Sequence, residues 1–213
     1  MALSVTEIVT AVMRGTENRL KSGVDPDPHM ELYLLIQELL HENRFWWARR
    51  TGSFATAAGT ILYDLSASGK NIPDVEEVIA AYRIDSATEF TELTPITLAL
   101  DEVAALHAVV AAKPDTYTLG LDGWQNFRLG APADGVYTIR LIYWAGLNTD
   151  GGVFSPASVI PYVPGTLHYG LIYGLKRRIY EFLFGQRDER FIVAAANWER
   201  FLKSAGRKPS YTT

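Results

Sequence analysis

The chain of 213 residues contains no cysteine. Disulfide bonds, thiolate metal sites and cysteine nucleophiles are therefore excluded, and no oxidising compartment is required. Long apolar runs are also missing, since none reaches the roughly 18 residues of a membrane-spanning helix, and residues 1–20 lack the continuous apolar segment of a secretion signal. With 48% hydrophobic residues, we expect a globular chain without a membrane or secretion address and with one sizeable core, or one core and a smaller lobe.

Motifs that indicate catalysis or cofactor binding are absent as well. The spacing of the histidines is not that of a metal site or of a metal-bound base. The four are His29, His41, His107 and His168. Neither a nucleophile elbow, nor a dinucleotide-binding glycine motif, nor a complete phosphate-binding loop occurs. We therefore expect no enzyme, no cofactor and no metal, although a hydrolase whose carboxylates meet only in the folded chain stays open as a hypothesis.

Charge is distributed unevenly along a chain whose net charge is −4. From Gly165 onward there are nine Lys and Arg residues against four acids, a net charge of +5, and the rest of the chain has a net charge of −9. This asymmetry suggests two faces with different partners. A helix face that is only solvated gives the same pattern, so both interpretations stay open.

The strongest pattern in the sequence is an amphipathic helix within residues 161–185. Apolar residues recur every four positions, as they do on one face of a helix. They are Leu167, Leu171, Leu175, Ile179 and Leu183. Pro161 and Pro164 precede this row and Gly185 follows it, and these are the positions that proline and glycine favour at helix ends. We expect the rest of the chain to be organised around this helix.

A second row on the same helix consists of Tyr169, Tyr173 and Tyr180. One layer of partner residues cannot cover so wide an apolar surface. Gly170 and Gly174 lie one turn apart, and because glycine costs about 0.5–1 kcal/mol in a helix interior, we expect another backbone to approach closely there. Two interpretations stay open: a central core helix, or a helix of which part of the surface faces another subunit.

Three other long helices are predicted near the ends of the chain. Residues 4–7 fit a capping box, so the first helix should begin at Val5 and stop before Gly23. The second should extend from about Met30 to Trp47. The last follows Gly185, and its apolar residues between Phe191 and Leu202 keep helical spacing.

Short β-type runs separate the two helical regions. Three of them predict strands at residues 54–57, 60–65 and 75–84. The alternation in residues 117–129, interrupted by Asp122-Gly123, predicts a hairpin. Residues 136–144 are apolar on both faces and predict a central strand, and a short helix should begin at Thr97.

These elements predict an α+β fold, a helical bundle from N- and C-terminal helix pairs with a central antiparallel β insert. The expected divisions are residues 1–52 for the N-terminal helix pair, 53–158 for the β-rich insert with one short helix, and 159–213 for the C-terminal helix pair and tail. The tail from Gly206 is polar and basic, so by itself it should be disordered.

Several segments carry a recognisable order of motifs. Leu32 begins L-x-x-L-I-x-E-L-L followed by R-F-W-W-A, Phe54 begins F-x-T-x-A-G-T-x-x-Y-D-L-S, and Leu167 begins L-x-Y-G-L-x-Y-G-L. Residues 94–97, the strand from Tyr137 to Trp144 and Val159-Ile160-Pro161 lie between them. This order, which extends from Leu32 to Trp198, resembles the head-to-tail adaptor (connector) proteins of tailed bacteriophages.

The resemblance implies a structural virion protein that forms a ring, dodecameric in that family, beneath the portal. Such a ring extends the DNA channel through which the genome is ejected, and it offers a platform to a nozzle, stopper or tube protein. The expected location is the neck of the virion, with assembly in the cytoplasm of the bacterial host. The resemblance also implies a portal-binding C-terminal arm, here Arg207, Lys208, Pro209, Ser210, Tyr211, Thr212 and Thr213.

For the contacts between subunits of such a ring, the aromatic residues and one arginine of the helical regions are the candidates. They are Tyr169, Tyr173, Arg177, Tyr180, Trp46 and Trp47. A chain of net charge −4 suits a conduit that does not hold DNA tightly, because phosphate neutralisation dominates affinity for nucleic acid. The alternative is a binding module whose β lobe and aromatic side chains grip a carbohydrate or a peptide.

Overall fold

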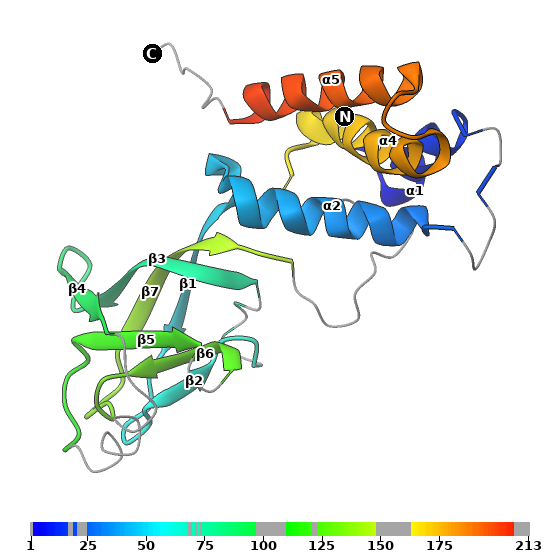
Figure 1. Ribbon diagram of the computed structural model, residues 1–213. Helices are drawn as coiled ribbons and strands as arrows, with labels where there is room; N and C mark the ends of the chain where they lie inside the picture. The colour runs from blue at the N-terminus through cyan, green and yellow to red at the C-terminus, as the bar shows by residue number, and fades with distance from the viewer. Residues whose placement is uncertain are drawn as a thin grey trace, which may run out of the picture. The chain divides into compact units, whose positions relative to one another are not determined.

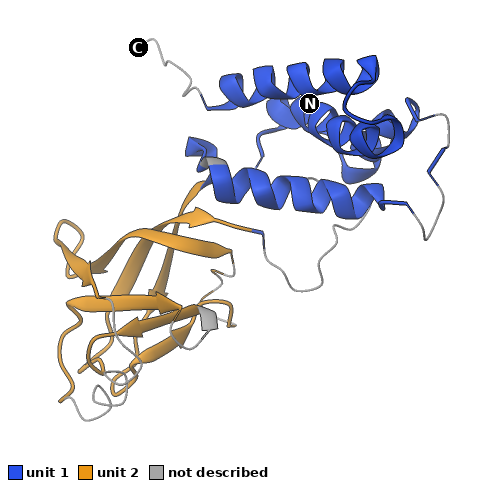
Figure 2. Ribbon diagram, in the orientation of Figure 1, with its two compact units in different colours: residues 1–48, 147–213 blue, residues 49–146 orange. Residues whose placement is uncertain are grey.

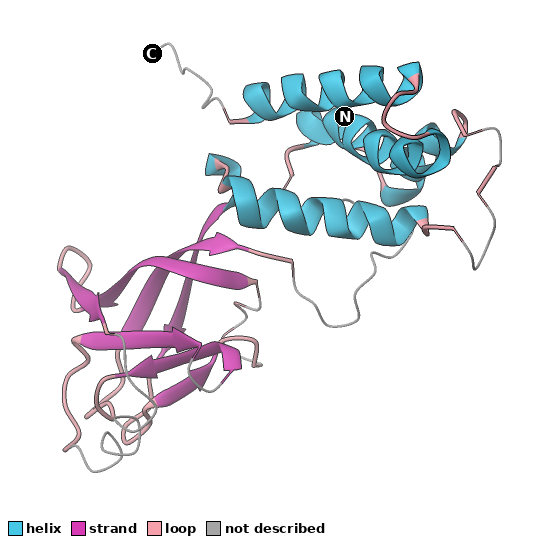
Figure 3. Cartoon of the chain, viewed as in Figure 1, coloured by secondary structure: helices cyan, strands magenta, loops and turns pink. Residues whose placement is uncertain are grey.

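A computed structural model of the chain describes residues 2–16, 19–20, 25–67, 70, 72, 74–96, 110–120, 123–147 and 163–206. The chain divides into two compact units, one of residues 1–48 and 147–213 and the other of residues 49–146 (Figure 2). The first unit is helical and the second consists of β-strands (Figure 3). The fold is therefore α+β, as the sequence predicts.

In the part that the structure describes, the helical unit contains four α-helices and two short 3-10 helices. They are α1 (Val5–Met13), α2 (Pro28–Asn43), η1 (Trp46–Ala48), η2 (Gly165–Leu167), α4 (His168–Phe184) and α5 (Glu189–Ala205). The helix α4 packs against α1, α2 and α5 (Figure 1). The N-terminal and C-terminal helices thus pack together, and the helix with the strongest sequence pattern lies at their centre.

The apolar row of α4 explains this central position. Leu171, Leu175 and Ile179 are completely buried, and burial of each such side chain stabilises the folded chain by about 1.5–3 kcal/mol relative to exposure. The helix ends at Gly185, whose φ of 79° lies in the left-handed region that glycine adopts at little cost. Both features agree with the sequence prediction for this helix.

The glycines of α4 serve a different purpose from the predicted one. A Cβ atom on Gly170 would overlap the ring of Phe201, and one on Gly174 would lie 2.7 Å from Trp198 and 2.8 Å from Leu35. The prediction that another backbone approaches these glycines is therefore wrong. Side chains of α5 and α2 occupy the space, because the missing methyl groups leave hollows into which bulky rings fit.

The start of the chain is fixed to the start of α4. The amide of Glu7 donates to Ser4 Oγ (3.3 Å) and the amide of Ser4 donates to Glu7 Oε2 (2.7 Å), which is the predicted capping box. The amide of Leu3 donates to Nδ1 of the buried His168 (2.9 Å). The other ring nitrogen, Nε2, donates to the carbonyl of Val163 (2.9 Å). His168 is thus a hydrogen-bonded structural residue.

The helix α2 ends four residues before the predicted position. Arg44 adopts φ 42° and ψ 52°, a left-handed conformation that cannot continue an α-helix. The predicted end at Trp47 is therefore wrong, and Trp46 and Trp47 lie in η1. At the other end, Asp27 accepts a hydrogen bond from the amide of His29 (3.0 Å) and Pro28 occupies the first turn, as is common at helix starts.

The β unit contains one seven-stranded sheet in the order β1-β7-β3-β4-β5-β6-β2. Its strands are β1 (Arg49–Ala55), β2 (Leu62–Asp64), β3 (Val75–Ile84), β4 (Phe90–Pro95), β5 (Thr116–Gly120), β6 (Gly123–Leu129) and β7 (Thr138–Ala145). The predicted hairpin is the antiparallel pair β5–β6, and the predicted central strand β7 lies between β1 and β3.

Two features of the sheet differ from the prediction. The strands β4 and β5 pair in parallel at Thr94–Thr116 and Pro95–Tyr117, so the insert is a mixed sheet and not a purely antiparallel one. The connection of about 20 residues between these strands is long enough to return the chain to a parallel start. The strand β7 is not apolar on both faces, because Ile139 and Leu141 are buried whereas Arg140 is exposed.

The core of the β unit is aromatic. The ring of Phe127 is stacked on Tyr117 at 5.0 Å and meets Phe54 edge-on at 5.4 Å, and Phe54 also contacts Tyr63 at 5.3 Å. All four side chains are buried, so they build the interior of the sheet rather than a binding platform. The helix predicted to begin at Thr97 and the tail from Arg207 lie outside the described residues.

Candidate subunit interface

A shallow groove runs along the surface of the helical unit between α4 and α5. It has a volume of about 280 Å³. Its lining residues are Tyr173, Lys176, Tyr180, Glu189, Arg190, Val193, Ala194 and Asn197. We call it the α4–α5 groove. Two of the three tyrosines singled out from the sequence line it, because Tyr173, Lys176 and Tyr180 follow one another at helical spacing and share one face of α4.

The tyrosines of this face differ in exposure. Tyr169 is 60% exposed and Tyr173 is also exposed, whereas Tyr180 is only 6% exposed. A Cβ atom on Gly15 would overlap the hydroxyl of Tyr180, so this ring packs against the end of α1. Burial raises the pKa of Tyr180. Tyr169 and Tyr173 thus offer aromatic surface to a partner, while Tyr180 forms the floor of the groove and belongs to the core of its own chain.

The α5 wall of the groove was not found from the sequence. Val193 is 53% exposed and its neighbour Ile192 is similarly exposed, whereas Ala194 and Trp198 of the same helix are buried. A signal for this wall was present, since Ile192 and Val193 fall outside the apolar row that contains Ala194, Trp198 and Phe201. Exposed β-branched residues beside the buried row of a helix extend its apolar surface toward solvent.

Positive charge borders the groove at the start of α5. Arg190 donates to both oxygens of Asp188 (2.9 and 3.0 Å), and its guanidinium carbon lies 3.4 Å from the ring centroid of Phe184. Asp188 also accepts from the amide of Arg190 (2.9 Å) and caps α5. These hydrogen bonds hold the pKa of Asp188 below its usual value. The arginine is therefore held in place beside the groove.

A different side of α4 faces α2. Arg178 donates to Glu31 (3.0 Å) and to Glu38, both on α2. Arg177 and the exposed Phe182 border a second hollow of about 460 Å³ at this junction. Since Tyr180 and Arg178 are two positions apart, they lie about 160° apart around the helix axis. Arg178 is thus engaged within its own chain, and Arg177 lies on the surface beside it.

The tryptophan pair is divided between surface and interior. Trp47 is buried and its ring is stacked on Phe45, with 5.0 Å between the centroids and 17° between the planes. Trp46 is partly exposed. The candidate arm, residues 207–213, lies outside the described residues. Of the predicted interface residues, Tyr169, Tyr173, Arg177 and Trp46 therefore present side-chain surface, whereas Tyr180 and Trp47 are covered by their own chain.

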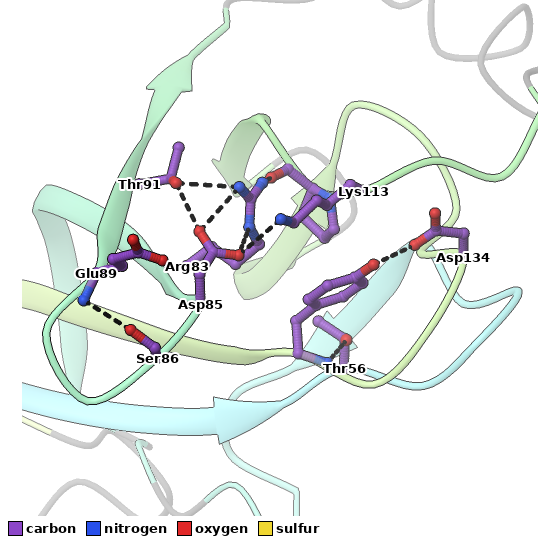
Figure 4. A network of polar contacts seen from close by, with 10 residues as sticks. Thr56, Arg83, Asp85, Ser86, Glu89, Thr91, Lys113 and Asp134 are labelled. Carbon is purple, nitrogen blue, oxygen red and sulfur yellow. Dashed lines mark hydrogen bonds and ion pairs between the residues drawn. The ribbon is translucent and has the colours of Figure 1, made fainter.

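The β unit carries a polar network at one end of its sheet (Figure 4). Arg83 is buried and donates to both oxygens of Asp85 (2.8 and 3.0 Å), to Thr91 Oγ1 (3.0 Å) and to the carbonyl of Pro114. Lys113 Nζ lies 2.9 Å from Asp85. The hydrogen bonds from Arg83, Thr91 and Lys113 hold the pKa of Asp85 well below its usual value. The network ties the β3–β4 turn to the segment that precedes β5.

A second set of bonds lies beside this network. Tyr137 donates through its hydroxyl to Asp134 (2.7 Å), and this bond raises the pKa of Tyr137. Thr56 accepts from the amide of Tyr137 (2.8 Å) and donates to the carbonyl of Gly135 (3.0 Å). These bonds fix the loop before β7. Each of these groups is paired with a structural partner, so the hydrogen bonds stabilise loops.

Within the described part of the chain, no cluster of three His, Asp or Glu side chains is placed to bind a metal ion. Among the same residues, no helix has the length and apolar character needed to cross a membrane.

Comparison with protein families identifies a match over nearly the whole chain. A family model described as SU10 adaptor protein matches residues 4–209. No curated protein matches the chain. The matched range begins at the N-cap of α1 and extends beyond the end of α5, so it includes the helical unit and the β unit alike.

Proposed function

The chain belongs to the SU10 adaptor protein family, and we propose that it acts as a ring of identical subunits between the phage portal and the tail. The family role is that of a structural head-to-tail adaptor. In the proposed ring, a dodecamer, the subunits enclose an extension of the DNA channel, bind the portal on one side, and present a platform to a nozzle, stopper or tube protein on the other. The location is the neck of the virion.

The observation that carries this proposal is the apolar surface of the helical unit. Tyr173 and Val193 are exposed on the two sides of the α4–α5 groove, and Tyr169 is exposed one turn before Tyr173 on α4. Aromatic residues are enriched at protein interfaces. A ring subunit must bury surface on both of its flanks, and this accounts for apolar residues that the monomer leaves in solvent.

Passage of DNA is the second part of the proposal. The chain has a net charge of −4, and a ring multiplies that charge. Since cationic side chains supply most of the affinity for the phosphate backbone, a ring of negative net charge binds the genome weakly and without sequence preference. A conduit requires this, because tightly held DNA would not be ejected.

Electron microscopy of the purified chain mixed with its portal protein tests the ring. We expect closed rings of twelve copies on the portal. No rings should form when an unrelated protein of similar size takes the place of the portal protein. A chain that stays monomeric on its portal, at concentrations well above those at which adaptors assemble, would refute the proposed function.

The C-terminal arm is a separate part of the proposal. The helix α5 ends at Ala205, and the seven residues from Arg207 to Thr213 contain two basic residues and no acid. We expect deletion of residues 207–213 to leave the helical circular-dichroism signal unchanged and to abolish binding to the portal. Replacement of the same seven residues by a Gly/Ser segment of equal length distinguishes the effect of sequence from that of length. If the deleted chain binds the portal as well as the full chain does, these residues are not the portal-binding arm.

A further inference from the structure

The outer side of α2 combines apolar and acidic residues. Met30, Leu34, Glu38 and Glu42 follow one another at four-residue spacing and are all exposed, and of these Glu38 is bonded to Arg178 of its own chain. The inner side of α2, by contrast, contains completely buried residues such as Ile36. We call these four exposed residues the α2 outer face. Two partly exposed apolar side chains next to two carboxylates form a surface suited to a protein partner rather than to water alone.

The charges of the helical unit are divided between its helices. The helix α2 contains three glutamates and no lysine or arginine, whereas α4 and α5 together contain six Lys and Arg residues and three glutamates. Arg178 bonds to Glu31 and Glu38 of its own chain. Glu42 lies on the α2 outer face and Lys176 lines the α4–α5 groove. Their charges are opposite, so a contact between two copies can pair them.

The two surfaces lie on different sides of the helical unit, because α4 is placed between α2 and α5 (Figure 1). A contact between different surfaces of identical chains is heterologous, and it can continue from copy to copy until a ring closes. The α4–α5 groove, at about 280 Å³, is at the lower limit of the roughly 300–1,000 Å³ typical of small-molecule sites. Its size suits a few side chains of another protein.

From these observations we propose that the α2 outer face of one copy docks into the α4–α5 groove of the next copy. Leu34 enters the groove beside Val193 and Tyr173, and Glu42 lies near Lys176. This contact rests on the proposed ring and specifies which flanks of neighbouring subunits meet. A second copy is the chosen occupant because the acidic, partly apolar face that complements the groove is present on the same chain.

Cysteine cross-linking tests the contact directly, because the natural chain has no cysteine. The variants are Leu34→Cys and Val193→Cys, at side chains that are 39% and 53% exposed. The control is Val136→Cys, in the β unit, where the side chain is 75% exposed. Each full-length variant is checked by circular dichroism, incubated alone or mixed in equal amounts, with and without the portal protein, and treated with a short bismaleimide.

We expect a cross-linked dimer in the mixture of Leu34→Cys and Val193→Cys, at a yield at least fivefold above that of either variant alone and of Leu34→Cys mixed with Val136→Cys. A chain that carries both cysteines should give a ladder of higher oligomers. Lys176→Glu in the Val193→Cys chain should lower the dimer yield at least threefold, and Glu42→Lys in the Leu34→Cys chain should restore it.

The outcomes separate the contact from the function. Rings on the portal without the mixed cross-link would overturn the contact and leave the proposed ring standing. Efficient Val193→Cys self-cross-linking would indicate two grooves facing each other and would also overturn it. The mixed cross-link without portal-bound rings would support the contact and contradict the proposed function. Absence of both cross-link and rings would contradict both.

Discussion

The helical unit and the β unit differ in which apolar side chains they expose and which charged side chains they bury. Among the described residues, seven large hydrophobic side chains are exposed in the helical unit, and these seven lie on helices. In the β unit five are exposed among the described residues, and two of these lie in loops. The β unit buries two arginines instead, Arg83 and Arg128, and Arg83 holds loop segments together through charged hydrogen bonds. The helical unit keeps most of its charges at the surface.

This difference indicates that the two units have different roles. Exposed apolar residues on regular helices form continuous surfaces on a rigid support, which suits the proposed contact between copies. Loops fixed by a buried charge are ordered without depending on a large core, and they suit a surface that must keep its shape. Four predictions test this comparison, beginning with the largest expected effect.

The first prediction concerns Trp198, whose ring packs against Gly174 of α4. Trp198→Ala removes the side chain that fills the hollow at Gly174, and the free energy of unfolding should fall by about 3–5 kcal/mol because a large buried ring is lost. Urea denaturation followed by circular dichroism at 222 nm measures this change. Ile192→Ala is the control on the exposed side of the same helix, with an expected change within about 0.5 kcal/mol. Equal effects would mean that α5 does not pack as described.

The second prediction concerns Gly174 itself. Gly174→Ala places a methyl group 2.7 Å from Trp198. Overpacking of this kind costs about 1–3 kcal/mol, which exceeds the gain of about 0.5–1 kcal/mol from better helix propensity. We therefore expect a net loss of stability in the same denaturation assay. The double variant with Trp198→Ala removes the overlap with the ring and leaves the one with Leu35 at 2.8 Å, so there the alanine should cost less than in the single variant. A stabilising effect of Gly174→Ala alone would contradict the packing.

The third prediction concerns the capping box of α1. Ser4→Ala removes the oxygen that accepts from the amide of Glu7, and the unfolding free energy should fall by about 1 kcal/mol, within the usual range of about 0.5–2. Thr10→Ala is a matched hydroxyl removal at an exposed position within the same helix, where better helix propensity should leave stability equal or higher. If both substitutions lower stability equally, the cap contributes nothing specific.

The fourth prediction compares acid sensitivity in the two units. The pKa of Asp85 is lowered in the folded state, so its ionised form stabilises the fold above the unfolded pKa of about 4. That contribution is lost progressively as the pH falls below this value toward the lower folded pKa. Asp85→Asn should therefore reduce the difference in stability between pH 7 and pH 3, as measured by denaturation at both values.

Asp188→Asn is the corresponding variant of the helical unit. The pKa of Asp188 is also lowered, with Arg190 as its main partner, whereas Asp85 has Arg83, Thr91 and Lys113. We expect the smaller loss of acid sensitivity for Asp188→Asn. The reverse order would mean that the network of the β unit does not distinguish it from the helical unit.

Features that depend on neighbouring residues were predicted well. Four such predictions agree with the structure. They are the capping box at Ser4, the strand from Val75 to Ile84, the β5–β6 hairpin and Gly185 at the end of α4. In each case a few consecutive residues contain the whole signal. A cap, a turn or a periodic row forms for local reasons, and tertiary packing then preserves it.

Features that depend on distant partners were missed. The strand β4 has one buried residue, Leu93, and its other side chains are exposed, so no alternation of apolar residues revealed it. It pairs in parallel with a strand that begins at Thr116, and nothing local to either segment indicates that direction. The groove wall at Val193 was missed although Ile192 and Val193 fall outside the buried row of α5, because the sequence does not show which helix lies opposite them.

By itself, the sequence determined the fold class, most helix and strand positions, and the adaptor family, because periodicity, caps and motif order are written in consecutive residues. Only the tertiary structure decided that rings and not a backbone fill the hollows at Gly170 and Gly174, that Tyr180 and Trp47 are covered while Tyr169 and Tyr173 are exposed, and that Arg83 is buried with Asp85. Whether each of these side chains is buried depends on which segments pack against it, and those segments lie far apart in the chain.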